Sequence, residues 1–264
     1  MNRRIILLMF LNISIFMNAQ HQYRIGDKLQ VQQISVQEFP NILGEDLTWT
    51  MQDNKETKHF ANIKLTNCTE TSYAANISKI VEGTNFFYDI QHDSLQLKGH
   101  RNKNISIKYD LPITEAIYPL SYGDSIHGYY AGKGILANNK YAFIVGKYSY
   151  HVCGVGKLVT LDSDTLDNTI LIKNTRLVSY EEISKNMLRK KYGKLGNVPI
   201  PNNQKIEDRI KNDSSLVKFE KISWYSPGYR YAVLEINKAS LTTPKGHKLF
   251  EYALYYAPED QQQQ

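Results

Sequence analysis

Apolar and polar residues alternate along most of the chain, and this two-residue period constrains the fold more than any other feature. The runs HFANIKL at 59–65, YAFIVGKYSY at 141–150 and YAVLEI at 231–236 show it. Successive side chains of a strand point to opposite faces, so such runs predict strands with one packed and one wetted face. Turn-forming residues, as at 162–164, separate the runs. The sequence therefore predicts a mainly β protein of antiparallel strands, arranged as a sandwich or as a strongly curved, half-open meander.

One region departs from this period. Residues 179–195, SYEEISKNMLRKKYGKL, place Ser179 and Glu182 at the spacing of a capping box, with apolar residues following on one face. The next segment, NNQKIEDRIKNDSS, is either a polar loop or a second short helix. We therefore expect a short helical insertion near residues 180–212, lying between strands and not forming a domain.

The first residues have the form of a secretory signal peptide. A cationic start, MNRR, precedes the apolar run at 5–17 and a cleavage position after Ala19. This run is shorter than the roughly 20 apolar residues that a transmembrane helix needs, so cleavage is favoured over an uncleaved anchor. We expect a signal peptide at 1–19 and no transmembrane segment in the mature chain.

The rest of the chain is expected to form one β-rich domain at 20–258. A sub-boundary is expected near 111–121, and residues 259–264 are predicted to be a disordered tail. Cleavage after residue 19 would remove two arginines and lower the net charge from +6 to +4. The remaining basic residues are mostly dispersed, whereas nucleic-acid binding requires a basic stripe or a recognisable module. We expect no nucleic-acid partner.

The chain has two cysteines, Cys68 and Cys153. An oxidising compartment permits a disulfide between them, which would close a long loop and stabilise by about 4–5 kcal/mol on the chain-entropy model. The alternative is two free thiols that pack as small apolar residues. The sequence is compatible with both a disulfide and two free thiols.

Catalytic motifs are incomplete. Residues 128–134 are one residue short of a phosphate-binding loop and lack its Ser or Thr. The Gly-Asp-Ser sequence that ends at Ser125 matches the nucleophile block of one esterase class, but that class needs a later Asp-x-x-His. The one such spacing, Asp89 to His92, comes earlier in the chain, and a serine without its base is a weak nucleophile. The histidines and carboxylates form no metal-ligand or acid–base pattern, so we predict no catalytic residue, metal or cofactor.

Aromatic residues gather at 221–236, KISWYSPGYRYAVLEI, around a Ser-Pro-Gly turn. Alternation assigns three residues of this stretch to apolar faces of the core: Trp224, Leu234 and Ile236. The others near the turn are the candidate ligand-binding residues: Tyr225, Tyr229, Arg230 and Tyr231. We expect Tyr229 and Arg230 to remain at least partly exposed, because the turn holds them near solvent.

Four blocks resemble those of an uncharacterised family of secreted, β-rich proteins from Bacteroidota bacteria. These blocks are ISVQEFPNILGEDLTWTMQD, IYPLSYGDSIHGYYAGKG, VGKLVTLDSDTLDNTILIK and WYSPGYRYAVLE. The resemblance implies an exported β-rich protein and brings no established activity with it. Many relatives end in a sorting domain for type IX secretion, which the final YYAPEDQQQQ does not resemble. We therefore expect the periplasm, with the cell surface or the extracellular space as alternatives.

The same resemblance implies O-glycosylation at an Asp followed by Ser or Thr and then a small or apolar residue. Three hydroxyl residues match this pattern: Ser94, Ser125 and Thr165.

Two functional hypotheses remain. The first is a non-catalytic envelope protein that binds a glycan, a protein or an apolar small molecule through a sheet face or a half-open barrel. The second is a hydrolase whose residues meet only in three dimensions. Paired carboxylates in a cleft would favour the hydrolase, a concave apolar face would favour a carrier, and a tyrosine-rich face would favour glycan or protein binding.

Overall fold

A computed structural model describes residues 23–39, 41–91, 93–138, 140–243, 246–257 and 261. The predicted signal peptide and most of the predicted tail lie outside these residues. The strands are β1 (Lys28–Ile34), β2 (Gly44–Thr50), β3 (Glu56–Asn67), β4 (Ile77–Val81), β5 (Thr84–Gln91), β6 (Ser94–Arg101), β7 (Ile105–Ile117), β8 (Ser125–Leu136), β9 (Tyr141–Val159), β10 (Thr165–Ile183), β11 (Val217–Tyr225), β12 (Leu234–Thr243) and β13 (Gly246–Tyr255).

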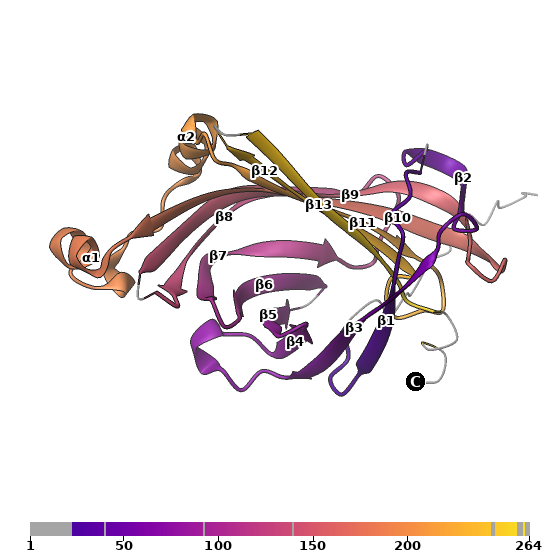
Figure 1. Cartoon of the computed structure of the whole chain (residues 1–264), viewed down its shortest axis with the longest axis horizontal. Helices are drawn as coiled ribbons and strands as arrows, with labels where there is room; N and C mark the ends of the chain where they lie inside the picture. The colour runs from indigo at the N-terminus through magenta and orange to yellow at the C-terminus, as the bar shows by residue number, and fades with distance from the viewer. Residues whose placement is uncertain are drawn as a thin grey trace, which may run out of the picture.

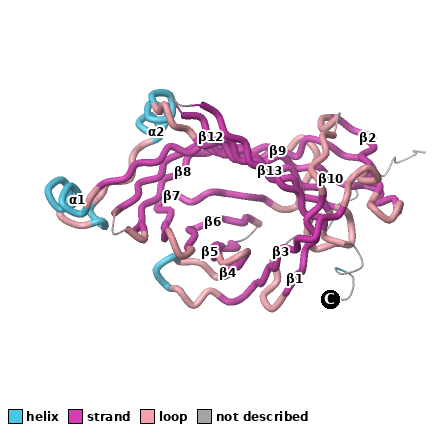
Figure 2. Tube along the Cα trace, viewed as in Figure 1, coloured by secondary structure: helices cyan, strands magenta, loops and turns pink. Residues whose placement is uncertain are grey.

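Twelve of these strands form a closed, antiparallel barrel (Figures 1 and 2). Strands β3 to β13 follow one another around the wall, and β1 closes it by pairing with both β13 and β3. The predictions of a mainly β fold and of antiparallel strands are confirmed. The expectation of a sandwich or a half-open meander is wrong, because β1 joins the two ends of the meander. The strands on both sides of the 111–121 region belong to this one barrel.

Strand β2 lies outside the ring. It pairs in parallel with β9, from Gly44 beside Gly154 to Thr50 beside Val159. Strand β8 pairs with residues 141–151 of β9. Strand β2 pairs with the next part of β9, residues 154–159, so it continues the sheet beyond the end of β8.

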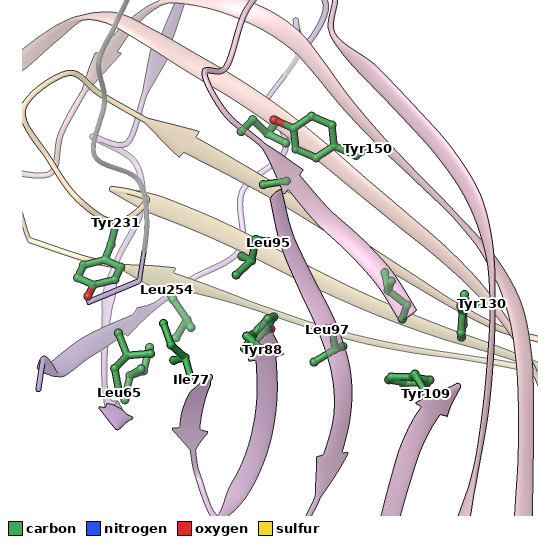
Figure 3. Packing of buried hydrophobic residues seen from close by; sticks show 14 of the residues in the cluster. Leu65, Ile77, Tyr88, Leu95, Leu97, Tyr109, Tyr130, Tyr150, Tyr231 and Leu254 are labelled. Carbon is green, nitrogen blue, oxygen red and sulfur yellow. The ribbon is translucent and has the colours of Figure 1, made fainter. Parts of the chain in front are cut away.

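Separate apolar clusters cover the two faces of the wall. One fills the barrel, and Figure 3 shows its tyrosines and aliphatic side chains within the ring of strands. Another lies outside, where Trp49 of β2 meets Trp224 of β11 edge-on at a centroid distance of 6.2 Å. Leu234 and Ile236 of β12 join this outer cluster. The prediction that Trp224, Leu234 and Ile236 are core residues is confirmed.

The helical insertion follows β10 and consists of α1 (Lys185–Tyr192), a short 3-10 turn at Leu195–Asn197 and α2 (Asn203–Asn212). Ser184 caps α1 by accepting a hydrogen bond from the Met187 N–H. The predicted capping box that begins at Ser179 is wrong, because β10 pairs with β9 as far as Ile183 and keeps Ser179 in the sheet. The ladder to β9 outweighs the local capping signal.

The second helix of the insertion packs on the outside of the barrel. Ile206 and Ile210 of α2 are buried against Ala131 of β8 and Val145 of β9. Among the residues that the structure describes, neither these helices nor any other helix has the length and apolarity to span a membrane.

Both cysteines are free thiols in the structure. Cys153 is buried in the outer cluster, whereas Cys68 is half-buried just after β3.

Candidate functional site

Five charged side chains project from different strands toward the interior of the barrel, among its tyrosines. They are Lys79 of β4, Glu115 of β7, Arg176 of β10, Lys221 of β11 and Glu235 of β12. A charge removed from water requires a partner of opposite sign or hydrogen bonds. The interior satisfies this requirement with two groups of contacts.

The first group surrounds Glu115. Arg176 donates a hydrogen bond to one carboxylate oxygen, and the Tyr88 hydroxyl donates to the other at 3.2 Å. Burial would raise the pKa of Glu115, but the positive charges of Arg176, Lys221 and Lys79 outweigh it and hold that pKa below its ordinary value. Glu115 is therefore a carboxylate at neutral pH.

The second group surrounds Glu235. The Tyr256 hydroxyl donates to one carboxylate oxygen at 2.9 Å, and the Lys221 ammonium lies 3.8 Å from the other. Burial would lower the pKa of Lys221, yet the charges of Glu235 and Glu115 raise it above its ordinary value. The Lys79 ammonium donates to the Tyr23 hydroxyl at 3.1 Å. Burial would lower the pKa of Lys79 as well, but Tyr23 and the charge of Glu235 raise it above its ordinary value, so both lysines remain cations.

Four of the five charged side chains border a cavity of about 30 Å³ inside the barrel: Lys79, Glu115, Lys221 and Glu235. Its wall includes Leu95 of β6, Tyr150 of β9 and Ile172 of β10, and Figure 3 labels Leu95 and Tyr150. Six tyrosine side chains take part in the wall: Tyr23, Tyr118, Tyr150, Tyr225, Tyr231 and Tyr256. Aromatic rings therefore form much of the wall, and aliphatic and charged side chains complete it.

One polar atom in this cavity stands out. The Tyr150 side chain is only 1% exposed, and its hydroxyl has no hydrogen-bond partner among the described residues. Burial raises the pKa of Tyr150 far above its ordinary value, so the hydroxyl keeps its proton and is a donor. An unsatisfied buried hydroxyl costs about 1–3 kcal/mol. The Tyr150 hydroxyl therefore marks a position where a polar atom of a ligand would be stabilised.

The structure brings three of the four predicted ligand-binding residues together. Tyr225, Arg230 and Tyr231 line the cavity, whereas Tyr229 packs against the outer cluster. Tyr229 and Arg230 are half-buried, as expected. Tyr231 is buried, donates its hydroxyl to Asp27, and donates its backbone N–H to Gln261 at 2.9 Å. Three of the four predicted residues thus border an interior cavity, and the four together do not form an exposed platform.

The charged residues of the interior were missed by the sequence analysis. Each comes from a separate strand, and the partners are far apart in the chain. A signal did exist, since Lys79 stands between Ile77 and Val81 on one face of its strand. A charge inside an otherwise apolar face of a strand is the pattern that could have identified it.

Glu115 is not suited to act as the general acid of a glycosidase. Glu115 and Glu235 line the same cavity, but a glycosidase needs one carboxyl group that holds a proton near neutral pH. The charge of Arg176 keeps Glu115 ionised. The site can donate and accept hydrogen bonds, and Glu115 has no proton to give.

Ser125 also lacks the features of a nucleophile. It lies directly opposite His151 in the β8–β9 ladder, and both residues are exposed. The structure gives no hydrogen bond between them, and neither residue lines the cavity. In the described part of the chain, no group of three or more His, Cys, Asp or Glu side chains is placed to hold a metal ion.

The predicted glycosylation positions are the first residues of three strands: Ser94 of β6, Ser125 of β8 and Thr165 of β10. These strands run in the same direction, but β10 is longer, and its residue level with Ser125 is Lys173, through His151 of β9. Ser125 and Thr165 are exposed, and Ser94 is half-buried.

Comparison of the chain with protein-family models, with curated proteins and with solved structures gives no match. The arguments about function therefore rest on this barrel and its interior.

Proposed function

We propose that this chain is a non-catalytic envelope protein that binds a glycan through the polar cavity of its barrel. The observation that carries the proposal is the buried Tyr150 hydroxyl without a partner, in a wall of tyrosine rings and paired charges. Sugar hydroxyls both donate and accept hydrogen bonds, and the C–H faces of a sugar pack on aromatic rings. The cavity offers both complements, with acceptors in Glu115 and Glu235 and donors in Lys79 and Lys221.

The size of the cavity sets how a glycan would enter. About 30 Å³ of such space admits two or three water-sized groups, since one water needs roughly 10–15 Å³ by this measure. One edge of a sugar would therefore enter, with its hydroxyls near Tyr150. The remainder would lie beside Tyr225 and Arg230, which are half-buried and reach solvent. An acyl chain would not fit this space, so the cavity favours a glycan over an apolar ligand.

Export forms the second part of the proposal. The expected signal peptide at 1–19 and the resemblance to secreted proteins of Bacteroidota support it, and the periplasm is the proposed compartment. A glycan-binding protein would meet its ligands there.

Titration calorimetry with a panel of neutral, acidic and amino sugars and their short oligomers tests binding. We expect Tyr150→Phe to weaken binding of the best ligand about three- to tenfold, because it removes one hydrogen bond worth about 0.5–1.5 kcal/mol. Tyr148→Phe is the matched control, since Tyr148 lies on the same strand and does not line the cavity. Binding that is equally strong in Tyr150→Phe and in the wild type would refute this site.

The alternative hypothesis, a hydrolase, is tested with the same panel of sugars and oligomers. Release of new reducing ends by the wild type, lost in Glu235→Gln, would replace the binding proposal with a catalytic one.

A further inference from the structure

A second cavity lies outside the barrel, under the helical insertion. It has a volume of about 260 Å³, several times that of the interior cavity. Its floor is the outer face of β8, β9 and β10, and its other side is formed by α1, the start of α2 and the segment 198–201. Figures 1 and 2 show both helices outside the ring of strands. We call this space the insertion cleft.

The walls of the insertion cleft are largely apolar. Phe143 and Ile183 belong to its floor, and Met187, Tyr192 and Ile200 to the insertion. Met187 is 62% exposed and Ile200 is 53% exposed, although both border this apolar space. Apolar side chains gathered around a concave space are typical of ligand-binding sites.

The insertion is anchored on both sides of the cleft. Ile206 and Ile210 fix α2 to the barrel, and Leu188 of α1 is buried. The rings of Phe143 and Tyr192 meet edge-on at a centroid distance of 6.4 Å. The cleft is therefore held open by packed contacts on both sides.

Charge at the cleft is unbalanced. Lys133 pairs with Asp110 at 3.3 Å, and Arg209 pairs with Glu181 at 2.9 Å. Two further cations line the cleft without an ion pair among the described residues: Lys191, which lies over the Tyr192 ring, and Lys205. Four cations thus face two carboxylates, which leaves a net charge of +2. An occupant with a negative end would be attracted to Lys191 and Lys205.

We propose that the insertion cleft binds a medium-chain fatty acid. The apolar walls would take the alkyl chain, and Lys205 and Lys191 would hold the carboxylate. A volume of 260 Å³ is just below the range of about 300–1,000 Å³ that is usual for drug-sized ligands, which favours a medium chain over a long one. This site is separate from the glycan cavity, because the two share no lining residue.

Calorimetry with decanoate, methyl decanoate and hexadecanoate tests the proposal. We expect decanoate to bind most tightly, because the ester lacks the charge and hexadecanoate exceeds the space. Lys205→Gln should weaken decanoate binding about three- to tenfold and leave binding of the ester unchanged. Lys211→Gln is the matched control on the same helix, since Lys211 is exposed and lies outside the cleft.

A second measurement locates the ligand. The ¹³C-labelled methyl group of Met187 should shift in the NMR spectrum as decanoate is added, and Ile200→Asp should abolish the shift. Ile200 is exposed, so this variant is expected to fold. Tyr150→Phe should leave decanoate binding unchanged, which separates this site from the glycan cavity. Equal affinity for acid and ester, equal affinity in Lys205→Gln and the wild type, or an unmoved Met187 signal would overturn the proposal.

Discussion

Removal of the Arg176 charge should destabilise the barrel strongly. In Arg176→Met the buried carboxylate of Glu115 loses its direct ion pair and keeps the Tyr88 hydroxyl, with the lysines Lys79 and Lys221 in the same interior. Loss of one partner from a buried ion pair costs about 3–5 kcal/mol. We expect a loss near the lower end, about 3 kcal/mol, because these neighbours still stabilise the carboxylate. That is a large share of the about 5–15 kcal/mol that holds a typical domain folded.

The direction in which stability changes with pH tests whether the unpaired charge of Glu115 causes this loss. In the wild type the lowered pKa of Glu115 gives stability that is present above its unfolded pKa of about 4.3 and is lost as the pH falls. In Arg176→Met burial should dominate and raise the pKa of Glu115. The variant should then lose stability as the pH rises through that raised value. The difference between the two proteins should be largest near pH 8 and shrink toward pH 5.

Urea denaturation followed by tryptophan fluorescence is a suitable assay, because Trp49 and Trp224 are both buried in the outer cluster. The double variant Arg176→Met/Glu115→Gln should recover most of the loss, since it removes the unpaired charge. A destabilisation below about 1 kcal/mol, or one that does not vary with pH, would refute the reasoning. So would a double variant as unstable as Arg176→Met.

Three further outcomes are expected. Burial, helped by the charge of Arg176, lowers the pKa of His100 to about 4. The wild type should therefore lose stability as the pH falls from 6.5 to 4, and denaturant titrations of His100→Gln should lack this pH-dependent loss. Leu234→Ala should cost about 2–5 kcal/mol, and Tyr229→Ala clearly less in the same series; equal losses would contradict the half-buried position of Tyr229. Gly134→Ala should cost about 1–3 kcal/mol by thermal denaturation, because the new methyl group would overlap the Ser106 carbonyl oxygen; an unchanged Tm would show that the backbone shifts without cost.

Alternation predicts the strands well because it is a local property of each segment. It assigns Trp224, Leu234 and Ile236 correctly to the core. It also leads to Tyr225 and Arg230, because a Pro-Gly turn next to aromatic strands is visible in one short stretch. These assignments come from single short stretches of the sequence and need no knowledge of distant partners.

The predictions that were wrong or missing depend on contacts between residues that are far apart in the chain. Closure of the barrel needs Ile34 beside Ala253, and the interior ion pair needs Glu115 beside Arg176. The false capping signal at Ser179 has the same origin, because pairing with Val145 holds that residue in a strand. No window of neighbouring residues contains such information.

The seam between β1 and β13 has a consequence for the order in which the barrel assembles. In the described residues β13 pairs with β1 only at Gln32–Ile34, whereas the β9–β10 hairpin pairs from Val159 and Thr165 to Tyr141 and Ile183. The hairpin forms from neighbouring segments, but β1 is synthesised first and cannot meet β13 until almost the whole chain exists. Pairing between distant segments is slow. The short seam should therefore form last in folding and exchange its amide hydrogens first in the native protein.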